Sequence, residues 1–297
     1  MERKISFYSS GLRLSAVVYQ PDTPSSDGYA GVVLCHGPGG TKENLMPQVA
    51  GYLVKAGYSA MCFDYRGWGE SEGKPNRIYP MEQAEDVINA ITALQQQPNV
   101  NQKAIGLWGA ATGGSIASYV SAIDSRVRCM VSVSGMGDLG RWLRSVRRYW
   151  EWKSFLERLD KDRMARVQTG VSELAESSSL ILRDPVTENY VKRMEELHPE
   201  MKGRKLLISL ESVESWLSFR PELFVGGISP RAAMWICAGL DTLVPVEESI
   251  SMYSRAGEPK KLLILQEEHH SLYQGKAFEK IMTATVSWFN DHLLPEG

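Results

Sequence analysis

The sequence predicts an α/β fold, in which a mostly parallel central sheet is covered by helices on both faces. Short apolar runs alternate with longer segments whose apolar residues recur three and four positions apart, which is typical of strands joined by crossover helices. The chain has 297 residues, 43% hydrophobic and 23% charged, an ordinary globular composition. At this length a protein buries about 75% of its unfolded surface, so the core needs neither disulfides nor metals.

Each predicted strand is an apolar run that contains β-branched residues or cysteines. These runs are residues 31–37, 58–67, 103–110, 128–135, 231–241 and 260–270. The predicted crossover helices are amphipathic and cover residues 46–57, 81–97 and 113–124. Near the N-terminus, KISFYSSGLRLSAVVYQP predicts a hairpin, so we expect the sheet to begin with antiparallel strands.

The strand–helix alternation is interrupted by one long segment, residues 137–227, which is rich in Arg, Trp and Glu and has helical periodicity. Ligands of open α/β sheets bind outside the carboxyl ends of the strands. An insertion that leaves one strand and returns to the next must lie over that region. We therefore expect a helical cap, or lid, at 137–227 on an α/β core formed by residues 1–136 and 228–297.

The segment GLWGAATGGS (106–115) predicts a sharp turn from a strand into a helix. Small residues surround the turn, as in the nucleophile elbow G-x-S-x-G, where they let the backbone pack closely around a strained nucleophile. Alignment of the glycines places Ala111 at the nucleophile position. The nucleophile expected there is serine.

Several further motifs follow in a fixed order: HGPGG with TKE (36–43), FDYRGWGESEG (63–73), the elbow, AGLDTLVP (238–245) and HHSLYQG (269–275). With them the chain resembles the α/β-hydrolase superfamily, near its dienelactone hydrolase-like and capped acyl-esterase or thioesterase branches. The resemblance covers nearly the whole chain outside 137–227. It implies a serine-type hydrolase of an ester, lactone or thioester; acyl transfer or cyclisation is compatible with the same site.

The resemblance also implies a triad in the chain order nucleophile, acid, histidine. Asp241 matches the acid, because it follows a strand and precedes LVP; Asp138, after the preceding strand, is the alternative. His269 matches the histidine, because Tyr273 follows it at the spacing that family members often show. The adjacent His270 remains an alternative.

Two backbone N–H groups are needed to stabilise a developing oxyanion. One is expected from Thr112, the residue after the nucleophile position. The second normally comes from the residue after His-Gly, but here this residue is Pro38, which has no N–H. Gly39 or Gly40 is then expected to donate.

Ala111 has two interpretations. In the first, a natural serine has been replaced to give an inactive variant. In the second, the protein naturally lacks the nucleophile, and either binds a ligand or catalyses a reaction with its acid and histidine alone. The first is favoured, because the rest of the catalytic set is present.

The start of the predicted cap, GRWLRSVRRYWEWKSF (140–155), interleaves basic and aromatic residues. We expect the arginines to face water and the aromatic side chains to line an apolar or aromatic acyl pocket. The predicted pocket residues are Trp142, Tyr149, Trp150 and Trp216.

The formal net charge of −2 disfavours a nucleic-acid partner. No apolar run approaches the ~20 residues of a membrane span, and MERKISFYSS lacks the apolar stretch of a signal peptide. We expect a cytoplasmic protein, monomeric or homodimeric, with a small-molecule acyl substrate. No metal-ligand spacing or cofactor motif is present, so neither group is expected.

Overall fold

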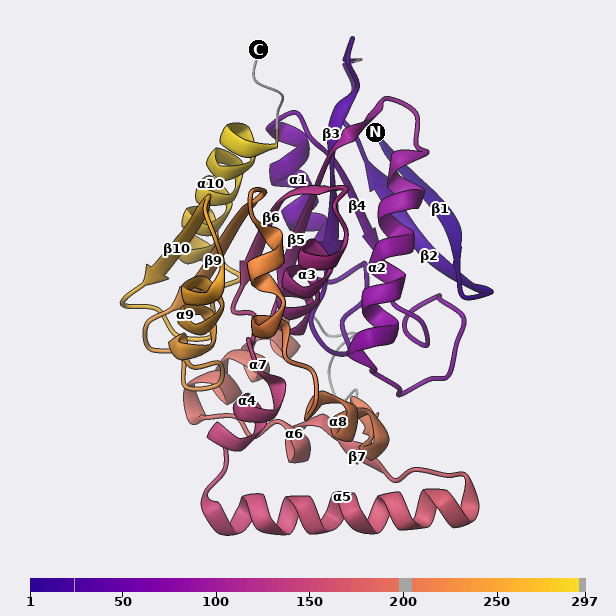
Figure 1. Cartoon of the computed structure of the whole chain (residues 1–297), viewed down its shortest axis with the longest axis vertical. Helices are drawn as coiled ribbons and strands as arrows, with labels where there is room; N and C mark the ends of the chain where they lie inside the picture. Colours follow the sequence, from indigo (N-terminus) through magenta and orange to yellow (C-terminus); the bar gives the residue numbers. More distant parts are fainter. Residues whose placement is uncertain (24, 198–204, 294–297) are drawn as a thin grey trace.

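A computed structural model describes residues 1–23, 25–197 and 205–293 of the chain (Figure 1). Its core is an eight-stranded sheet with the strand order β1-β2-β4-β3-β5-β6-β9-β10. β1 and β2 form the predicted hairpin, and β2 also pairs antiparallel with β4, whereas the remaining pairs are parallel. The strands are β1 (Glu2–Ser9), β2 (Leu12–Tyr19), β3 (Tyr29–Cys35), β4 (Ser59–Phe63), β5 (Val100–Ala110), β6 (Val127–Val133), β9 (Ala232–Ala238) and β10 (Lys260–Leu265).

Helices cover both faces of this sheet, because its central strands are apolar on both sides. The helices α1 (Met46–Lys55) and α10 (Gly275–His292) pack on one face. On the other face lie α2 (Pro80–Gln95), α3 (Thr112–Ile123) and α9 (Val246–Arg255). The prediction of an α/β fold with a mostly parallel sheet is confirmed, and the predicted helices begin within one residue of the observed ones.

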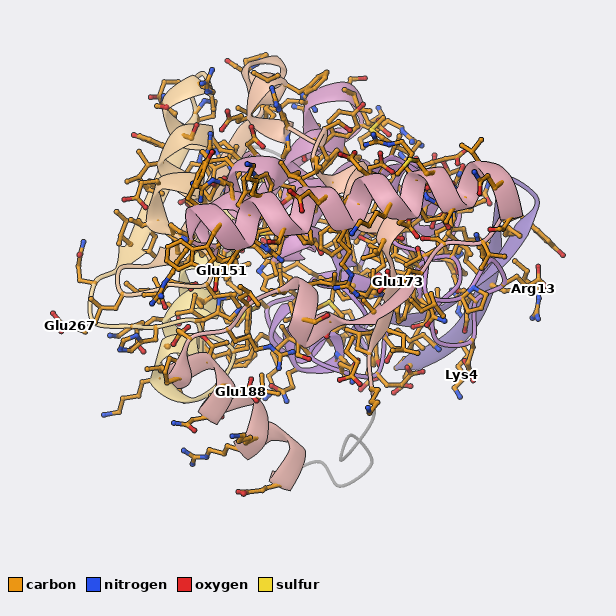
Figure 2. All side chains as sticks on the ribbon, turned by 90° about the horizontal axis from the view of Figure 1, so that it is seen from below. Lys4, Arg13, Glu151, Glu173, Glu188 and Glu267 are labelled. Carbon is orange, nitrogen blue, oxygen red and sulfur yellow. The ribbon has the colours of Figure 1, made fainter. Side chains whose placement is uncertain are left out.

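Residues 137–227 connect β6 to β9 and lie beyond the carboxyl ends of the parallel strands (Figure 1). We call this segment the insertion. It contains a small antiparallel sheet besides its helices, and α5 crosses its outer surface (Figure 2). Its elements are α4 (Leu139–Ser145), α5 (Tyr149–Thr169), β7 (Leu174–Glu176), α6 (Ser177–Leu180), α7 (Pro185–Leu197), β8 (Leu207–Ser209), α8 (Leu210–Trp216) and the 3-10 helix η2 (Pro221–Leu223), with a second 3-10 helix, η3 (Val225–Ile228), at its end.

One predicted strand is shorter than expected. The run 260–270 predicts a strand that continues through both histidines, but β10 ends at Leu265. The chain turns there, since the N–H of Glu268 donates to the Leu265 carbonyl at 3.1 Å. His269 and His270 therefore lie in the loop between β10 and α10.

Candidate active site

The turn between β5 and α3 has the geometry of a nucleophile elbow. Ala111 lies between the last residue of β5 and the first of α3. Its φ of 50° and ψ of −124° are a backbone conformation that residues other than glycine rarely adopt. A Cβ on Gly113 would lie 2.1 Å from the Cys35 carbonyl oxygen, and one on Gly109 would lie 2.3 Å from the Gly113 carbonyl oxygen. Glycine is therefore required at both positions, because the backbone at the start of α3 approaches the backbones of β3 and β5 closely.

The loop after β3 lies beside the elbow. A Cβ built on Gly37 would be 3.4 Å from the Ala111 methyl group. The Gly40 N–H donates to the Gly37 carbonyl at 3.2 Å, which closes a tight turn. Within the described part of the chain, the Gly39 N–H has no acceptor, so Gly39 is the better placed of the two predicted donors. Thr112 is buried at the first position of α3, where an N–H has no acceptor within the helix.

Asp241 forms its hydrogen bond with His270. The His270 Nδ1–H donates to Asp241 Oδ2 at 2.8 Å, and Asp241 Oδ1 accepts from the N–H groups of Leu243 and Val244 at 2.9 and 2.8 Å. The His269 ring instead places Nδ1 3.0 Å from the Leu240 carbonyl oxygen. This geometry corrects the preference for His269. The turn after β10 directs the second of the two adjacent rings toward the acid.

Asp138, the alternative acid, has a different role in the structure. Its Oδ1 accepts from the Arg141 N–H at 2.9 Å, which caps the N-terminus of α4. Its other oxygen lies 3.2 Å from Arg220 Nε. The carboxylate thus belongs to the base of the insertion, and the acid paired with a histidine is Asp241.

Other polar groups near the elbow are already engaged. Ser115 Oγ is buried and accepts from the Met136 N–H at 2.8 Å, and Ser71 Oγ donates to the Asp64 carbonyl at 2.6 Å. Burial raises the pKa of the Cys35 thiol to about 12, so this thiol is protonated at neutral pH. None of these three groups is a ready nucleophile.

Residues 28–276 match the family model described as "Serine aminopeptidase, S33". The chain belongs to this family of α/β-hydrolases. It is 28% identical to "Thiohydrolase aneE" of Aspergillus aculeatus over 88% of this chain and 85% of the relative. It is 26% identical to "Polyketide transferase grgF" of a Penicillium species over 91% of this chain and 90% of that protein.

Solved structures share the fold. A crystal structure of the α/β-hydrolase GrgF from a Penicillium species superposes with a TM-score of 0.81, at 24% identity and 99% coverage of both chains. A DcsB complex with its substrate analogue superposes with a TM-score of 0.84, at 19% identity and the same coverage. This chain is therefore an α/β-hydrolase in fold and in family.

The four aromatic residues predicted to line a pocket of this α/β-hydrolase lie in two different environments. Trp142 and Trp216 are buried at 2% and 0% exposure, and their indole N–H groups donate to the carbonyl oxygens of Leu243 and Ile78. Tyr149 and Trp150 are 68% and 61% exposed at the start of α5. Two of these side chains are therefore buried and two are exposed, and a pocket lined by all four stays a prediction.

The insertion places the side chain of Leu206 against the loop after β3. A Cβ on Gly39, whose φ is +68°, would lie 2.5 Å from both Leu206 methyl carbons, so this leucine packs directly on the glycine. Leu206 precedes β8 in an apolar stretch of the sequence. Sequence reasoning missed it, because only the folded chain brings the insertion back to the loop after β3.

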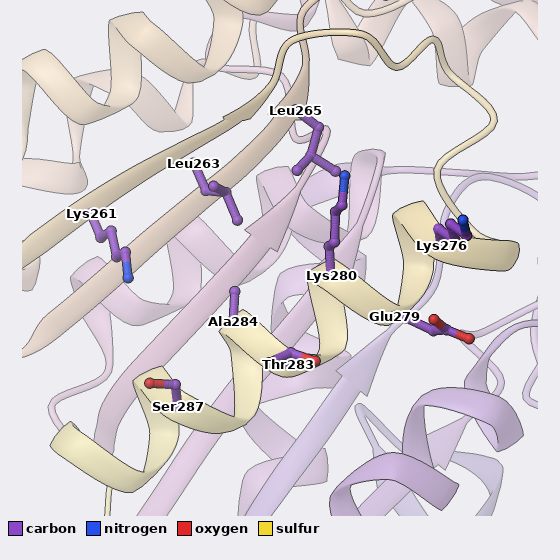
Figure 3. Close-up of a pocket in the computed structure, with 9 residues that line it drawn as sticks. All are labelled: Lys261, Leu263, Leu265, Lys276, Glu279, Lys280, Thr283, Ala284 and Ser287. Atoms are coloured by element: carbon purple, nitrogen blue, oxygen red, sulfur yellow. The ribbon is translucent and has the colours of Figure 1, made fainter.

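An open hollow lies elsewhere, between β10 and α10 (Figure 3). Leu263, Leu265 and Ala284 give it an apolar floor, and Lys261, Lys276 and Lys280 stand at its rim. None of its lining residues belongs to the elbow, the acid or the oxyanion loop. This α/β-hydrolase therefore carries its predicted catalytic residues apart from that hollow.

Three carboxylates that could be taken for a metal site hold a cation of the chain itself. Oxygens of Glu43, Asp64 and Glu70 lie within 4.8 Å of one another. The Lys42 Nζ contacts all three, at 2.7, 2.7 and 2.8 Å. The ammonium group supplies the positive charge between them.

No described helix is long and apolar enough to cross a membrane.

Proposed function

We propose that this site carries out serine-type acyl chemistry on an ester, lactone or thioester when position 111 carries a hydroxyl group. The hydrogen bond between Asp241 and His270 is the observation that carries the proposal. Asp241 and His270 lie on the loops that follow β9 and β10, and Ala111 follows β5. All three residues therefore lie at the carboxyl edge of one sheet. This is the arrangement that a triad requires.

Each residue then has a chemical role. Because His270 Nδ1–H donates to Asp241, the Nε2 lone pair can accept the proton of a serine hydroxyl at position 111 as that hydroxyl attacks the acyl carbon. Asp241 stabilises the imidazolium that results. The N–H groups of Thr112 and Gly39 stabilise the oxyanion. His270 returns the proton to the leaving group, and water or another acceptor releases the acyl group.

We propose that the insertion is a cap that encloses a small-molecule acyl substrate. The contact of Leu206 with Gly39 supports this, because it brings an apolar side chain of the insertion against the oxyanion loop. The names of two relatives, "Thiohydrolase aneE" and "Polyketide transferase grgF", favour a thioester or polyketide acyl group. Either hydrolysis or transfer to a second substrate is compatible with the same acyl enzyme.

A fluorophosphonate probe tests the acyl-enzyme proposal. We expect the Ala111→Ser protein to be labelled at the introduced serine and the unchanged chain to stay unlabelled. Adding His270→Ala should slow labelling by at least about 100-fold, since a general base contributes at least that factor. His269→Ala is the matched control and should label normally. A folded Ala111→Ser protein that is not labelled would refute the proposal.

A second candidate is chemistry without a covalent intermediate, which Ala111 itself favours. The chain lacks the hydroxyl, yet keeps a histidine oriented by a carboxylate that can activate a bound water or a nucleophile of the substrate. It predicts that the unchanged chain hydrolyses or cyclises a small thioester at a rate that falls on His270→Ala substitution. If neither the unchanged chain nor the Ala111→Ser protein reacts but both bind the thioester, the chain is a binding protein. Activity that appears only after Ala111→Ser substitution identifies a disarmed enzyme.

A further inference from the structure

The turn that carries the acid is held from the side by the insertion. We call residues 241–244 the acid turn. Asp241 Oδ1 accepts from Leu243 N and Val244 N, so the carboxylate and the backbone of the turn form one unit. The Leu243 carbonyl oxygen accepts from Trp142 Nε1 at 2.7 Å. Trp142 belongs to α4 and is buried, so this bond fastens the acid turn to the first helix of the insertion.

A second attachment lies just beyond the acid turn, at the start of α9. Glu248 is buried at 2% exposure. Its oxygens accept from Arg141 Nε and Nη2, each at 2.8 Å, and from the N–H groups of Gly137 and Asp138 at 2.9 and 3.0 Å. Arg141 and Trp142 are consecutive residues of α4. One helix therefore holds the chain on both sides of Val244.

Arg141 also joins the two ends of the insertion. Its guanidinium Nη2 lies 2.7 Å from Glu222 Oε2, and the Glu222 N–H donates to the Gly137 carbonyl at 3.0 Å. Burial by itself raises the pKa of Glu222, but the hydrogen bonds from Arg141 and Ser251 hold it below its ordinary value. The base of the insertion is thus an ionic unit in which one guanidinium binds two buried carboxylates.

We propose that α4 is a brace for the acid turn, in which Trp142 and Arg141 are positioning residues that hold Asp241 against His270. Trp142 acts through the Leu243 carbonyl, and Arg141 acts through Glu248. This inference depends on the proposed function in one respect, because it assumes that Asp241 and His270 act as a pair. It gives Trp142 a role in positioning the acid, where the sequence predicted a pocket wall.

The physical reason is the cost of an unpaired buried carbonyl. Without the indole N–H, the Leu243 carbonyl loses its donor, a penalty of the kind that makes a turn rearrange. A shift of Leu243 moves the N–H that Asp241 Oδ1 accepts, and the carboxylate moves with it. The hydrogen bond from His270 Nδ1–H to Asp241 Oδ2 then lengthens, and the imidazole loses the partner that orients it.

The test follows the His270 Nδ1–H proton by NMR in the unchanged Ala111 chain, because its chemical shift reports the hydrogen bond to Asp241. Trp142→Phe keeps an aromatic ring but removes the indole N–H, and we expect the His270 Nδ1–H resonance to move upfield as that hydrogen bond lengthens. Trp216→Phe is the matched control, because Trp216 is equally buried but donates to the Ile78 carbonyl, outside the acid turn. It should leave the His270 resonance unchanged. Equal shifts in both variants, or a shift in neither, would overturn the brace.

The ionic half of the brace has its own control. Arg141→Lys removes the guanidinium fork that reaches both Glu222 and Glu248, and should move the His270 Nδ1–H resonance upfield as Trp142→Phe does. Arg220→Lys changes an arginine at the same base that contacts Asp138 but not α9. It should not move the resonance. An Arg141→Lys protein whose His270 Nδ1–H resonance matches that of the unchanged chain would remove Arg141 from the brace.

Two further measurements separate this inference from the proposed function. Asp241→Asn should move the His270 Nδ1–H resonance more than any other variant; if it does not, no pair exists to be braced and the inference fails. Added to the Ala111→Ser protein, Trp142→Phe should lower kcat while KM stays the same, whereas loss of a pocket wall would raise KM. If the Ala111→Ser protein is never labelled by the probe but Trp142→Phe still shifts His270, the brace stands and the acyl-enzyme proposal falls.

Discussion

The ammonium group of Lys42 lies 2.7 Å from Asp64 Oδ2, and both side chains are buried, at 1% and 0% exposure. The Lys42 N–H donates to the other Asp64 oxygen at 2.7 Å. Asp64 directly follows β4, whereas Lys42 lies in the loop that carries Gly39 and Gly40. The pair therefore ties the oxyanion loop to the sheet. Burial alone would lower the pKa of Lys42, but its bonds to the three carboxylates raise it above its ordinary value.

Lys42→Met should destabilise the protein strongly. The substitution leaves the Asp64 carboxylate buried without its cation, and breaking a buried pair in this way costs about 3–5 kcal/mol. Urea denaturation followed by circular dichroism measures the change. Lys74→Met is the control, because Lys74 is 56% exposed and pairs with Glu211 at the surface; its cost should stay below about 1 kcal/mol. Similar losses in the two variants would show that the buried pair contributes little.

The fold could be predicted because its signals are local. Each parallel strand is a short apolar run and each crossover helix is amphipathic, and these periodicities are set by residues within one element. The end of β10 was harder to place, because KKLLILQEEHH continues without a glycine or proline. The strand stops at Leu265, whose carbonyl accepts from the Glu268 N–H, and only the change from apolar to polar residues after Leu265 marks this turn.

The site could be predicted only in part, because its contacts join residues far apart in the chain. His269 and His270 are adjacent and chemically identical, and only the direction of the loop decides which ring meets Asp241. The indole of Trp142 is apolar enough for a pocket wall. Its N–H partner, the Leu243 carbonyl, is 101 residues away, and no sequence pattern reports such a bond.

Ala111→Gly should stabilise the protein. Ala111 holds φ at 50°, and a non-glycine residue in such a conformation stores about 1–3 kcal/mol. Glycine removes that strain but loses about 0.5–1 kcal/mol to the greater freedom of the unfolded chain. We expect a net gain of about 1 kcal/mol in the free energy of unfolding, the difference between these two terms. The neighbouring Ala110, in β5, is the control: Ala110→Gly should destabilise. A loss with both variants would mean that the elbow is not strained at Ala111.

Stability should depend on pH through Asp184, which caps α7. Its carboxylate accepts from the Val186 and Thr187 N–H groups at 2.8 and 3.1 Å. Burial raises the pKa of Asp184, but the bonds from Thr187, Thr242 and Val186 outweigh it and lower the pKa to about 2. A depressed pKa stabilises the fold above the unfolded value of about 3.9, and the stabilisation is lost as the pH falls toward 2.

Asp184→Asn isolates this effect, because asparagine also caps helices but does not titrate. The free energy of unfolding of the unchanged chain minus that of the variant should fall as the pH is lowered from about 4 to 2, and should be constant above about pH 5. Urea titrations at each pH give the difference. A difference that is the same at both ends of this pH range would show that the Asp184 carboxylate is not held in the folded state.

Leu206, rather than Trp150, should control the size of the acyl group that the site accepts. Leu206 packs on Gly39 beside the elbow, whereas Trp150 is 61% exposed on α5. In the Ala111→Ser protein, Leu206→Ala should raise kcat/KM for a bulky acyl ester relative to acetate by about tenfold, the scale on which a few methylene groups discriminate in an apolar pocket. Trp150→Ala should leave that ratio and the KM of both esters unchanged. The comparison is made on one pair of p-nitrophenyl esters, so that the leaving group is the same. A ratio that responds to Trp150 and ignores Leu206 would place the acyl pocket at the start of α5, away from the loop after β3.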